Sequence, residues 1–216
     1  MTTHTESTSP EPVARQYASE RPHRYQRDLL PLLLDGLAGL PAGARILDAG
    51  CGNGFISGEL LKHGFRVIGV DVSASGIDIC RRSYPEAEFH IASVGDPDLV
   101  RIVGNDFDGI VASEVIEHLY APADFFANGR RLLKDGGVLV LSTPYHGYLK
   151  NLLLALTGAM EAHLQPDHEG GHIKFWSRCS LELALRGHGF RVGGFKGCGR
   201  IPFLWKSMVV KAVKAE

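Results

Sequence analysis

Residues 46–54 read ILDAGCGNG, and this stretch decides the fold class of the chain. The apolar residues at its start predict the end of a buried strand. Glycines at positions 50, 52 and 54 allow the backbone to adopt positive φ and to approach a ligand closely. The spacing G-x-G-x-G differs from the dinucleotide fingerprint G-x-G-x-x-G, because Phe55 stands where the third glycine would be needed. The stretch therefore predicts a ligand-binding loop between a first strand and a first helix.

Downstream of this loop, short apolar runs alternate with helical patterns. The helical patterns cover residues 54–63, 74–83, 121–134 and 177–190. The apolar runs cover residues 44–49, 65–72, 88–94, 107–113 and 137–142, and two further strands are expected at 191–199 and 206–214. This alternation is typical of βαβ units in a parallel sheet that is covered by helices on both faces.

The rest of the chain is predicted to complete one domain over residues 15–216, after a disordered leader at 1–14. Residues 24–40 have a helical pattern, which Pro31 is expected to kink or to divide into two helices. Residues 148–164 predict one inserted amphipathic helix, followed by a histidine-rich loop. Together these form an insertion at about residues 146–174.

The bulk composition excludes several classes of protein. The chain has 216 residues and a formal net charge of −1, which argues against a general nucleic-acid binder. The charge is uneven, since residues 174–216 hold nine Lys and Arg against two Glu, a local charge of +7. The four cysteines show no paired spacing, and no run approaches the ~18 apolar residues of a membrane span. We therefore expect a reducing, cytoplasmic setting.

A second marker is Asp71, which ends the apolar run VIGVD, where a carboxylate can accept hydrogen bonds from ribose hydroxyls. With it, the chain resembles the class I S-adenosylmethionine-dependent methyltransferases. The resemblance rests on LDAGCGNG, GVDVS, FDGIVASEVIEHL and LLKDGGVLVLSTP, and is strong over residues 40–145. It implies an α/β fold with a Rossmann-like, doubly wound, seven-stranded sheet, mostly parallel with an antiparallel last strand. It also implies S-adenosylmethionine as the cofactor.

The same resemblance assigns cofactor-binding residues. Asp48 and the loop from Gly50 through Cys51 to Gly52 would hold the amino-acid end of the cofactor, and Asp71 its ribose. The remaining residues implied are Val72, Ser93 and Val94 around the adenine and Ser113 near the sulfonium.

The segment SEVIEHL at residues 113–119 has two interpretations. On the first interpretation the segment only begins a helix, with Ser113 as its cap, because the macrodipole favours acidic residues in a first helical turn. If it is helical, Glu114 lies one turn from both Glu117 and His118, and their side chains can converge. Two carboxylates and one imidazole would then form part of a site for Mg²⁺, Mn²⁺ or Zn²⁺.

The string E-x-x-E-H is similar to one shared by the ubiquinone-type O-methyltransferases and the small-RNA 2′-O-methyltransferases. This resemblance implies a metal held by Glu114, Glu117 and His118, with His172 as an added ligand. His118 and His146 are the candidate catalytic residues, because His146, with Tyr145, lies after the fifth strand, where a substrate would enter. The implied activity is O-methylation of a hydroxyl on a small aromatic or hydrophobic molecule. The alternatives are 2′-O-methylation of an RNA end and a non-catalytic, cofactor-binding partner subunit.

The apolar inserted helix and the segment IPFLWKSM at residues 201–208 also have two interpretations. They are either packed against the sheet edge, or they form a hydrophobic substrate pocket with shallow, peripheral membrane contact aided by the basic C-terminal region.

Overall fold

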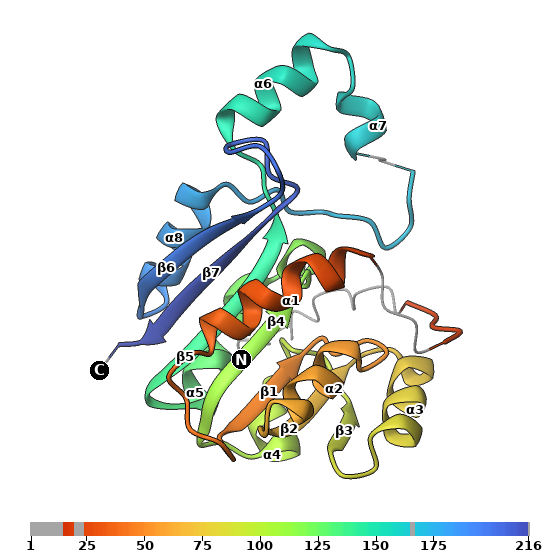
Figure 1. Ribbon diagram of the computed structural model, residues 1–216, viewed down its shortest axis with the longest axis vertical. Helices are drawn as coiled ribbons and strands as arrows, with labels where there is room; N and C mark the ends of the chain where they lie inside the picture. Colours follow the sequence, from red (N-terminus) through yellow and green to blue (C-terminus); the bar gives the residue numbers. More distant parts are fainter. Residues whose placement is uncertain (1–14, 20–23, 165–166, 216) are drawn as a thin grey trace, which may run out of the picture.

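The computed structural model describes residues 15–19, 24–164 and 167–215, and the predicted leader at 1–14 lies outside them. Its centre is one seven-stranded sheet in the order β3-β2-β1-β4-β5-β7-β6 (Figure 1). Strands β1 to β5 pair in parallel, and β7 is antiparallel to both β5 and β6. The predicted fold class is therefore confirmed. The strands are β1 Arg45–Ala49, β2 Arg66–Asp71, β3 Glu88–Ile91, β4 Phe107–Ser113, β5 Leu133–Pro144, β6 Phe190–Cys198 and β7 Ser207–Lys214.

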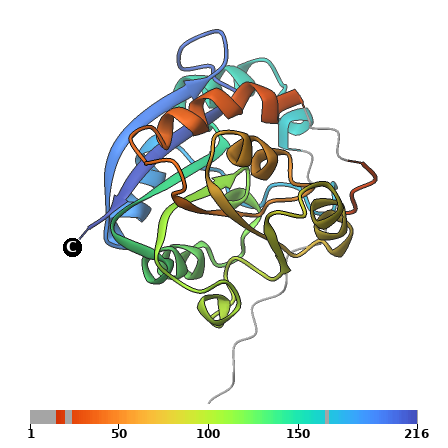
Figure 2. The same ribbon diagram turned by 60° about the horizontal axis from the view of Figure 1, so that its bottom comes forward.

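Helices cover both faces of this sheet (Figure 2). One layer contains α1 Arg24–Gly36, α2 Phe55–Lys62 and α3 Ala74–Ser83, and the other contains α4 Leu99–Val103, α5 Pro122–Leu132 and α8 Arg178–Gly187. Successive side chains of strand β5 point alternately to the two helical layers. Val138 and Val140 pack with α1, whereas Leu139 and Leu141 pack with α5 and α8.

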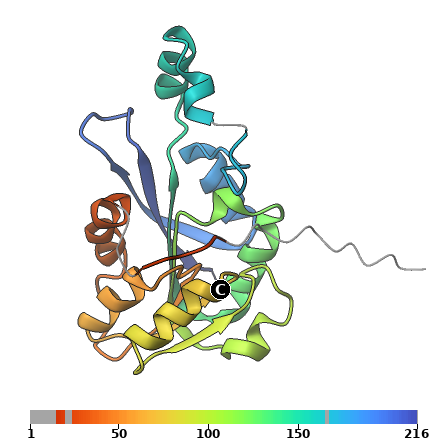
Figure 3. The ribbon, with the colours of Figure 1, turned by 90° about the vertical axis from the view of Figure 1, so that its right-hand side faces the viewer.

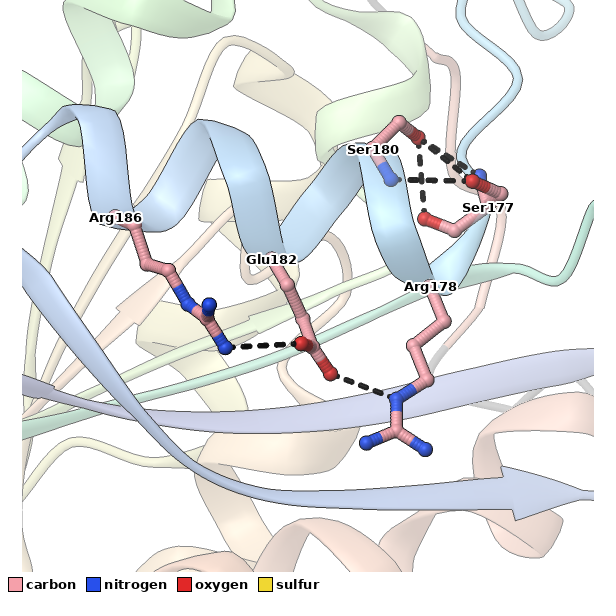
Figure 4. Close-up of polar contacts among 5 residues, drawn as sticks. All are labelled: Ser177, Arg178, Ser180, Glu182 and Arg186. Carbon is pink, nitrogen blue, oxygen red and sulfur yellow. Dashed lines mark hydrogen bonds and ion pairs between the residues drawn. The ribbon is translucent and has the colours of Figure 1, made fainter.

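Helix α8 begins at a reciprocal cap (Figure 4). The Ser177 hydroxyl accepts from the Ser180 backbone N–H at 3.1 Å, and the Ser180 hydroxyl accepts from the Ser177 N–H at 3.0 Å. One turn later the Glu182 carboxylate pairs with Arg178 at 2.7 Å and Arg186 at 3.3 Å. The cap fixes where the histidine-rich loop ends and the helix against β6 begins.

Two expected helices differ in the structure. Pro31 does not divide the helix, since α1 runs through it with the Pro31 ring exposed and Leu29 and Leu33 in the core. The inserted helix is divided into α6 Tyr148–Leu156 and α7 Met160–Leu164. The break lies at Gly158, whose φ of 69° belongs to the left-handed region that ends helices.

The insertion projects from the body at the carboxyl end of β5 (Figures 1 and 3). None of the helices in the described ranges has the length and apolar character needed to cross a membrane.

The core position of β5 gives a stability prediction. Leu139 is fully buried, so Leu139→Ala should lower the free energy of unfolding by about 2–5 kcal/mol through lost contacts and a residual cavity. Leu183 on α8 is 71% exposed, and Leu183→Ala should change it by less than about 0.5 kcal/mol. Urea unfolding followed by circular dichroism measures both. Equal losses for the two variants would contradict the assigned core.

Candidate functional site

The glycine loop lies at the carboxyl edge of the sheet, where β1 is flanked by β2 and β4. The strand order reverses here, since β2 and β3 follow β1 on one side and β4 and β5 lie on the other. Open α/β sheets bind ligands at such a switch point. The Gly50 and Cys51 N–H groups donate to the Val70 carbonyl at 2.8 and 3.0 Å, so the loop is tied to β2. Gly52 has φ 56°, and its N–H donates to the Asp71 carboxylate at 2.8 Å. The predicted loop and the predicted ribose acid therefore lie together.

A segment at residues 15–19 crosses this loop. The Tyr17 N–H donates to the Ser75 hydroxyl at 3.0 Å, and Asn53 donates to the Ser19 carbonyl at 3.0 Å. A Cβ atom on Gly52 would lie 2.6 Å from the Tyr17 hydroxyl oxygen, so the ring packs directly on the loop. Burial, and then the charge of Asp71, raise the pKa of Tyr17. Sequence analysis missed Tyr17 because no motif marks it, and only the fold brings it here.

Asp48 lies beneath the loop in the core. It is 1% exposed and accepts a hydrogen bond from the Ser57 hydroxyl of α2 at 2.6 Å. Burial raises the pKa of Asp48 to about 7, with Ser57 opposing the shift and Asp71 adding to it. In this position the carboxylate links β1 to the first turns of α2 and supports the loop from below.

The other predicted cofactor residues follow the same edge. Val72 follows the end of β2, and Ser93 is half-buried beyond β3, where its hydroxyl accepts from the Gly95 N–H at 3.3 Å. Val94 is buried in the core, and its carbonyl accepts from Asn128 at 3.1 Å. Ser113 ends β4, with its hydroxyl 3.4 Å from that of Ser142.

The interpretation of SEVIEHL as the first turn of an α-helix is wrong. Glu114 has φ 56°, in the left-handed region that is strained for residues other than glycine, and a single 3₁₀ turn, η1 Ile116–His118, follows it. The following helix, α5, begins only at Pro122. A Cβ atom on Gly50 would lie 2.5 Å from the Val115 side chain. The 3₁₀ turn therefore packs directly against the glycine loop.

This backbone separates the roles of the two glutamates. A carboxylate oxygen of Glu114 accepts from the Ser207 hydroxyl of β7 at 3.1 Å. Burial raises the pKa of Glu114 to about 7, although hydrogen bonds from Ser142 and Ser207 oppose the shift. Glu117 points elsewhere. It is fully buried, and neither of its carboxylate oxygens has a hydrogen-bond partner in the described part of the chain.

Glu117 instead forms a cluster with His118 and His172. One possible ligand atom from each residue lies within 4.8 Å of the others, whereas Glu114 is not part of this cluster. Burial, and then the charge of Glu114, raise the pKa of Glu117 well above its usual range. Burial lowers the pKa of His118. For His172, whose side chain stays partly exposed, desolvation and the neighbouring His118 lower the pKa to about 4, so both imidazoles are neutral at pH 7.

Backbone hydrogen bonds bring His172 to this cluster. The Ile173 and Lys174 N–H groups donate to the Glu117 carbonyl at 2.9 and 3.0 Å, which ties the histidine-rich loop to η1. The His118 Nδ1 atom lies 3.1 Å from the Gly171 carbonyl oxygen. With Nδ1–H as the donor, Nε2 of His118 keeps its lone pair, the tautomer that metal-binding histidines usually have.

His146 lies just beyond the carboxyl end of β5. It is 8% exposed, and its ring centroid lies 5.0 Å from that of Phe175 and 5.3 Å from that of His163. Burial lowers the pKa of His146 to about 4, and the charges of Lys150 and His163 add to the shift. The two predicted catalytic histidines, His118 and His146, thus lie on the same edge of the sheet in neutral form.

Together these features define an α/β enzyme that binds a nucleotide-like cofactor at the switch point of its sheet. A family model described as a methyltransferase domain matches residues 17–193. The chain belongs to this family, and it is an S-adenosylmethionine-dependent methyltransferase.

Individual relatives agree with this assignment. The ubiquinone biosynthesis O-methyltransferase of Aromatoleum aromaticum is 27% identical over 208 residues, which cover 89% of this chain and 88% of the relative. That of Alkalilimnicola ehrlichii is 34% identical over 155 residues, which cover 67% of this chain and 60% of the relative. A TehB-like SAM-dependent methyltransferase from Corynebacterium glutamicum shares the fold, with a TM-score of 0.63, 23% identity and coverage of 88% and 95%.

The packing of the glycine loop gives a prediction for cofactor binding. A Cβ atom on Gly76 of α3 would lie 2.5 Å from the Gly52 carbonyl oxygen, so Gly76→Ala must displace the loop. We expect at least about tenfold weaker binding of S-adenosylhomocysteine, measured by isothermal titration. Gly187→Ala is the matched control, since a Cβ atom there meets nothing within 4 Å. Unchanged affinity in Gly76→Ala would show that the loop does not hold the cofactor.

Asp48 gives a prediction about pH. The folded state keeps the Asp48 proton up to a pKa of about 7, whereas the unfolded chain loses it near 3.8, so stability should fall as the pH rises between these values. Asp48→Asn removes this loss. From about pH 5 to about pH 8, the free energy of unfolding should shift in favour of the variant by on the order of 1–3 kcal/mol.

Urea unfolding at the two pH values measures this shift. Asp78→Asn, at an exposed position on α3, should show no such change relative to wild type. A difference between wild type and Asp48→Asn that is constant with pH would contradict the raised pKa.

Proposed function

We propose that this methyltransferase transfers the methyl group to a hydroxyl of a small aromatic or hydrophobic molecule, with a divalent metal ion held by Glu117, His118 and His172. The observation that carries the proposal is the Glu117 carboxylate, which is fully buried without a hydrogen-bond partner in the described chain, beside two neutral imidazoles. A buried carboxylate without a donor is costly, and a bound cation would compensate for it.

The residues present fit a metal ion. Carboxylate and imidazole ligands suit Mn²⁺ and Zn²⁺, and a carboxylate with added waters suits Mg²⁺. The burial of the three residues is graded, from buried Glu117 through half-buried His118 to exposed His172, so the cluster is open on one side to a further ligand. Glu114 was also predicted as a ligand. It lies outside the cluster of Glu117, His118 and His172, so we do not include it among the proposed ligands.

The chemistry needs little from the protein beyond alignment. The carbon–sulfur bond to the methyl group breaks as the bond to the acceptor oxygen forms, which leaves S-adenosylhomocysteine and a proton from the hydroxyl. A bound divalent metal would lower the pKa of that hydroxyl and position it. His146 is neutral, and its depressed pKa makes it a weak base, which suits an acceptor that is already acidified.

The acceptor class is supported by the relatives and by the surroundings of the cluster. Both relatives are named for O-methylation in ubiquinone biosynthesis. Beside His146, Phe175 from the histidine-rich loop presents an aromatic ring at the same edge of the sheet. An aromatic hydroxyl compound matches both the ring and the metal ligands better than a highly charged acceptor does.

Metal titration of the cofactor-bound protein tests the proposal. Wild type should bind Mg²⁺, Mn²⁺ or Zn²⁺, and Glu117→Gln should weaken binding by at least about 100-fold, because it removes the charged ligand with little change of shape. Glu169→Gln, an exposed change in the histidine-rich loop, should bind like wild type. Binding of S-adenosylhomocysteine should be retained in both variants, which separates metal loss from misfolding.

A methyl-transfer assay on catechols, phenols and short RNAs then tests the acceptor. Metal-dependent turnover of a catechol or phenol supports the proposal. Equal metal binding in wild type and Glu117→Gln would contradict the metal site, and turnover of RNA alone would contradict the acceptor class.

A further inference from the structure

Thr143 on β5 carries a buried hydroxyl that has no hydrogen-bond partner in the described part of the chain. The residue is 0% exposed, so water cannot satisfy this hydroxyl either. A buried polar group without a partner costs free energy, and such groups are rare in folded proteins. Thr143 has no part in the cofactor loop or in the cluster of Glu117, His118 and His172, so its hydroxyl needs another explanation.

The strand register places Thr143 next to the 3₁₀ turn η1. Ser113, the last residue of β4, pairs with Ser142 of β5, so Thr143 lies one residue beyond this pair, where the chain leaves β4 for η1. Leu141, two residues before Thr143, packs in one cluster with Ile116 of η1. Since alternate residues of a strand share a face, the Thr143 side chain lies on the same face of the sheet as η1.

The Thr143 hydroxyl lies close to the Glu117 carboxylate without a hydrogen bond between them. As a donor it opposes the rise in the pKa of Glu117 that burial and the charge of Glu114 cause. Neither the hydroxyl nor either carboxylate oxygen has a described partner with the distance and alignment of a hydrogen bond. A buried donor and a buried acceptor, each without a partner, thus lie side by side.

Two other hydroxyls near η1 are used by Glu114 instead. The Ser142 hydroxyl accepts from the Glu114 N–H at 3.1 Å, and the Ser207 hydroxyl donates to the Glu114 carboxylate at 3.1 Å. Ser142 and Thr143 are successive residues of β5, so their side chains point to opposite faces of the sheet. One hydroxyl of β5 is therefore placed beside each glutamate, and Thr143 is the residue on the side of Glu117.

We propose that Thr143 is a positioning residue for the metal site. Its hydroxyl donates to one oxygen of the Glu117 carboxylate when a cation is bound, which leaves the other oxygen for the cation beside His118 and His172. This inference rests on the metal site proposed above. Hydrogen bonds from neighbouring groups orient the carboxylates that bind metals, and their loss typically weakens metal affinity about 10–100-fold.

Mn²⁺ titration in the presence of S-adenosylhomocysteine, followed by the electron paramagnetic resonance signal of free Mn²⁺, tests this role. Thr143→Val removes the hydroxyl with little change of shape and should weaken binding about 10–100-fold. Thr143→Ser keeps the hydroxyl and should restore most of the affinity. Thr157→Val is the matched control and should bind like wild type, because Thr157 is exposed and its hydroxyl donates only within α6 and its C-cap.

The stability of the metal-free protein separates positioning from packing. Valine replaces a buried hydroxyl that has no partner, so the urea midpoint of metal-free Thr143→Val should equal or exceed that of wild type. Serine leaves a small cavity in place of the methyl group, so Thr143→Ser should have a lower midpoint although it keeps the metal affinity. Both variants should bind S-adenosylhomocysteine as wild type does.

The outcomes distinguish this inference from the proposed function. Wild-type Mn²⁺ affinity in Thr143→Val, together with lost binding in Glu117→Gln, would overturn the role of Thr143 and leave the metal site intact. Equal losses of affinity in Thr143→Val and Thr143→Ser would also overturn it, and so would a lower urea midpoint of metal-free Thr143→Val. Absence of metal binding in wild type would overturn the metal site and the role of Thr143 together.

Discussion

The site depends on one steric constraint, which is the close packing around the glycine loop between β1 and α2. Side chains are excluded at three neighbouring points, where Gly50 meets Val115, Gly52 meets Tyr17, and Gly76 meets the Gly52 carbonyl. Since the loop is in contact on every one of these sides, the turn that carries Glu117 and His118 is held at a fixed place relative to the glycine loop. Methyl transfer requires alignment of donor and acceptor, and on the function proposed above this packing would supply it.

The fold was largely predictable from the sequence, whereas the candidate site was only partly predictable. Buried strands such as β4 and β5 appear as apolar runs, and the glycine loop and Asp71 have fixed places at strand ends. The turn after β4 was not predictable, because a helical period was assumed where Glu114 adopts a left-handed conformation. Tyr17 could not be found either, since its contact with Gly52 arises only from tertiary packing.

Three carboxylates lie at this edge of the sheet, with Asp48 and Glu117 buried and Glu114 half-buried, and they differ in the hydrogen bonds that they accept. Asp48 is supported by Ser57, and Glu114 by Ser207, so each has a neutral donor. Glu117 has neither donor nor counter-charge from the described residues. Burial raises the pKa of all three. Each therefore opposes folding at neutral pH, which is the common pattern at sites where function conflicts with stability.

The two backbone hydrogen bonds from residues 173 and 174 to the Glu117 carbonyl have an evolutionary consequence. They fix the position of His172 through main-chain atoms. Any residue can supply the carbonyl acceptor, and any residue except proline can supply the N–H donor. The intervening insertion, from α6 to the start of the histidine-rich loop, is therefore free to change in length and sequence while the third member of the cluster keeps its position. A family can in this way exchange the outer segment, and with it the surroundings of the acceptor, without rebuilding the centre.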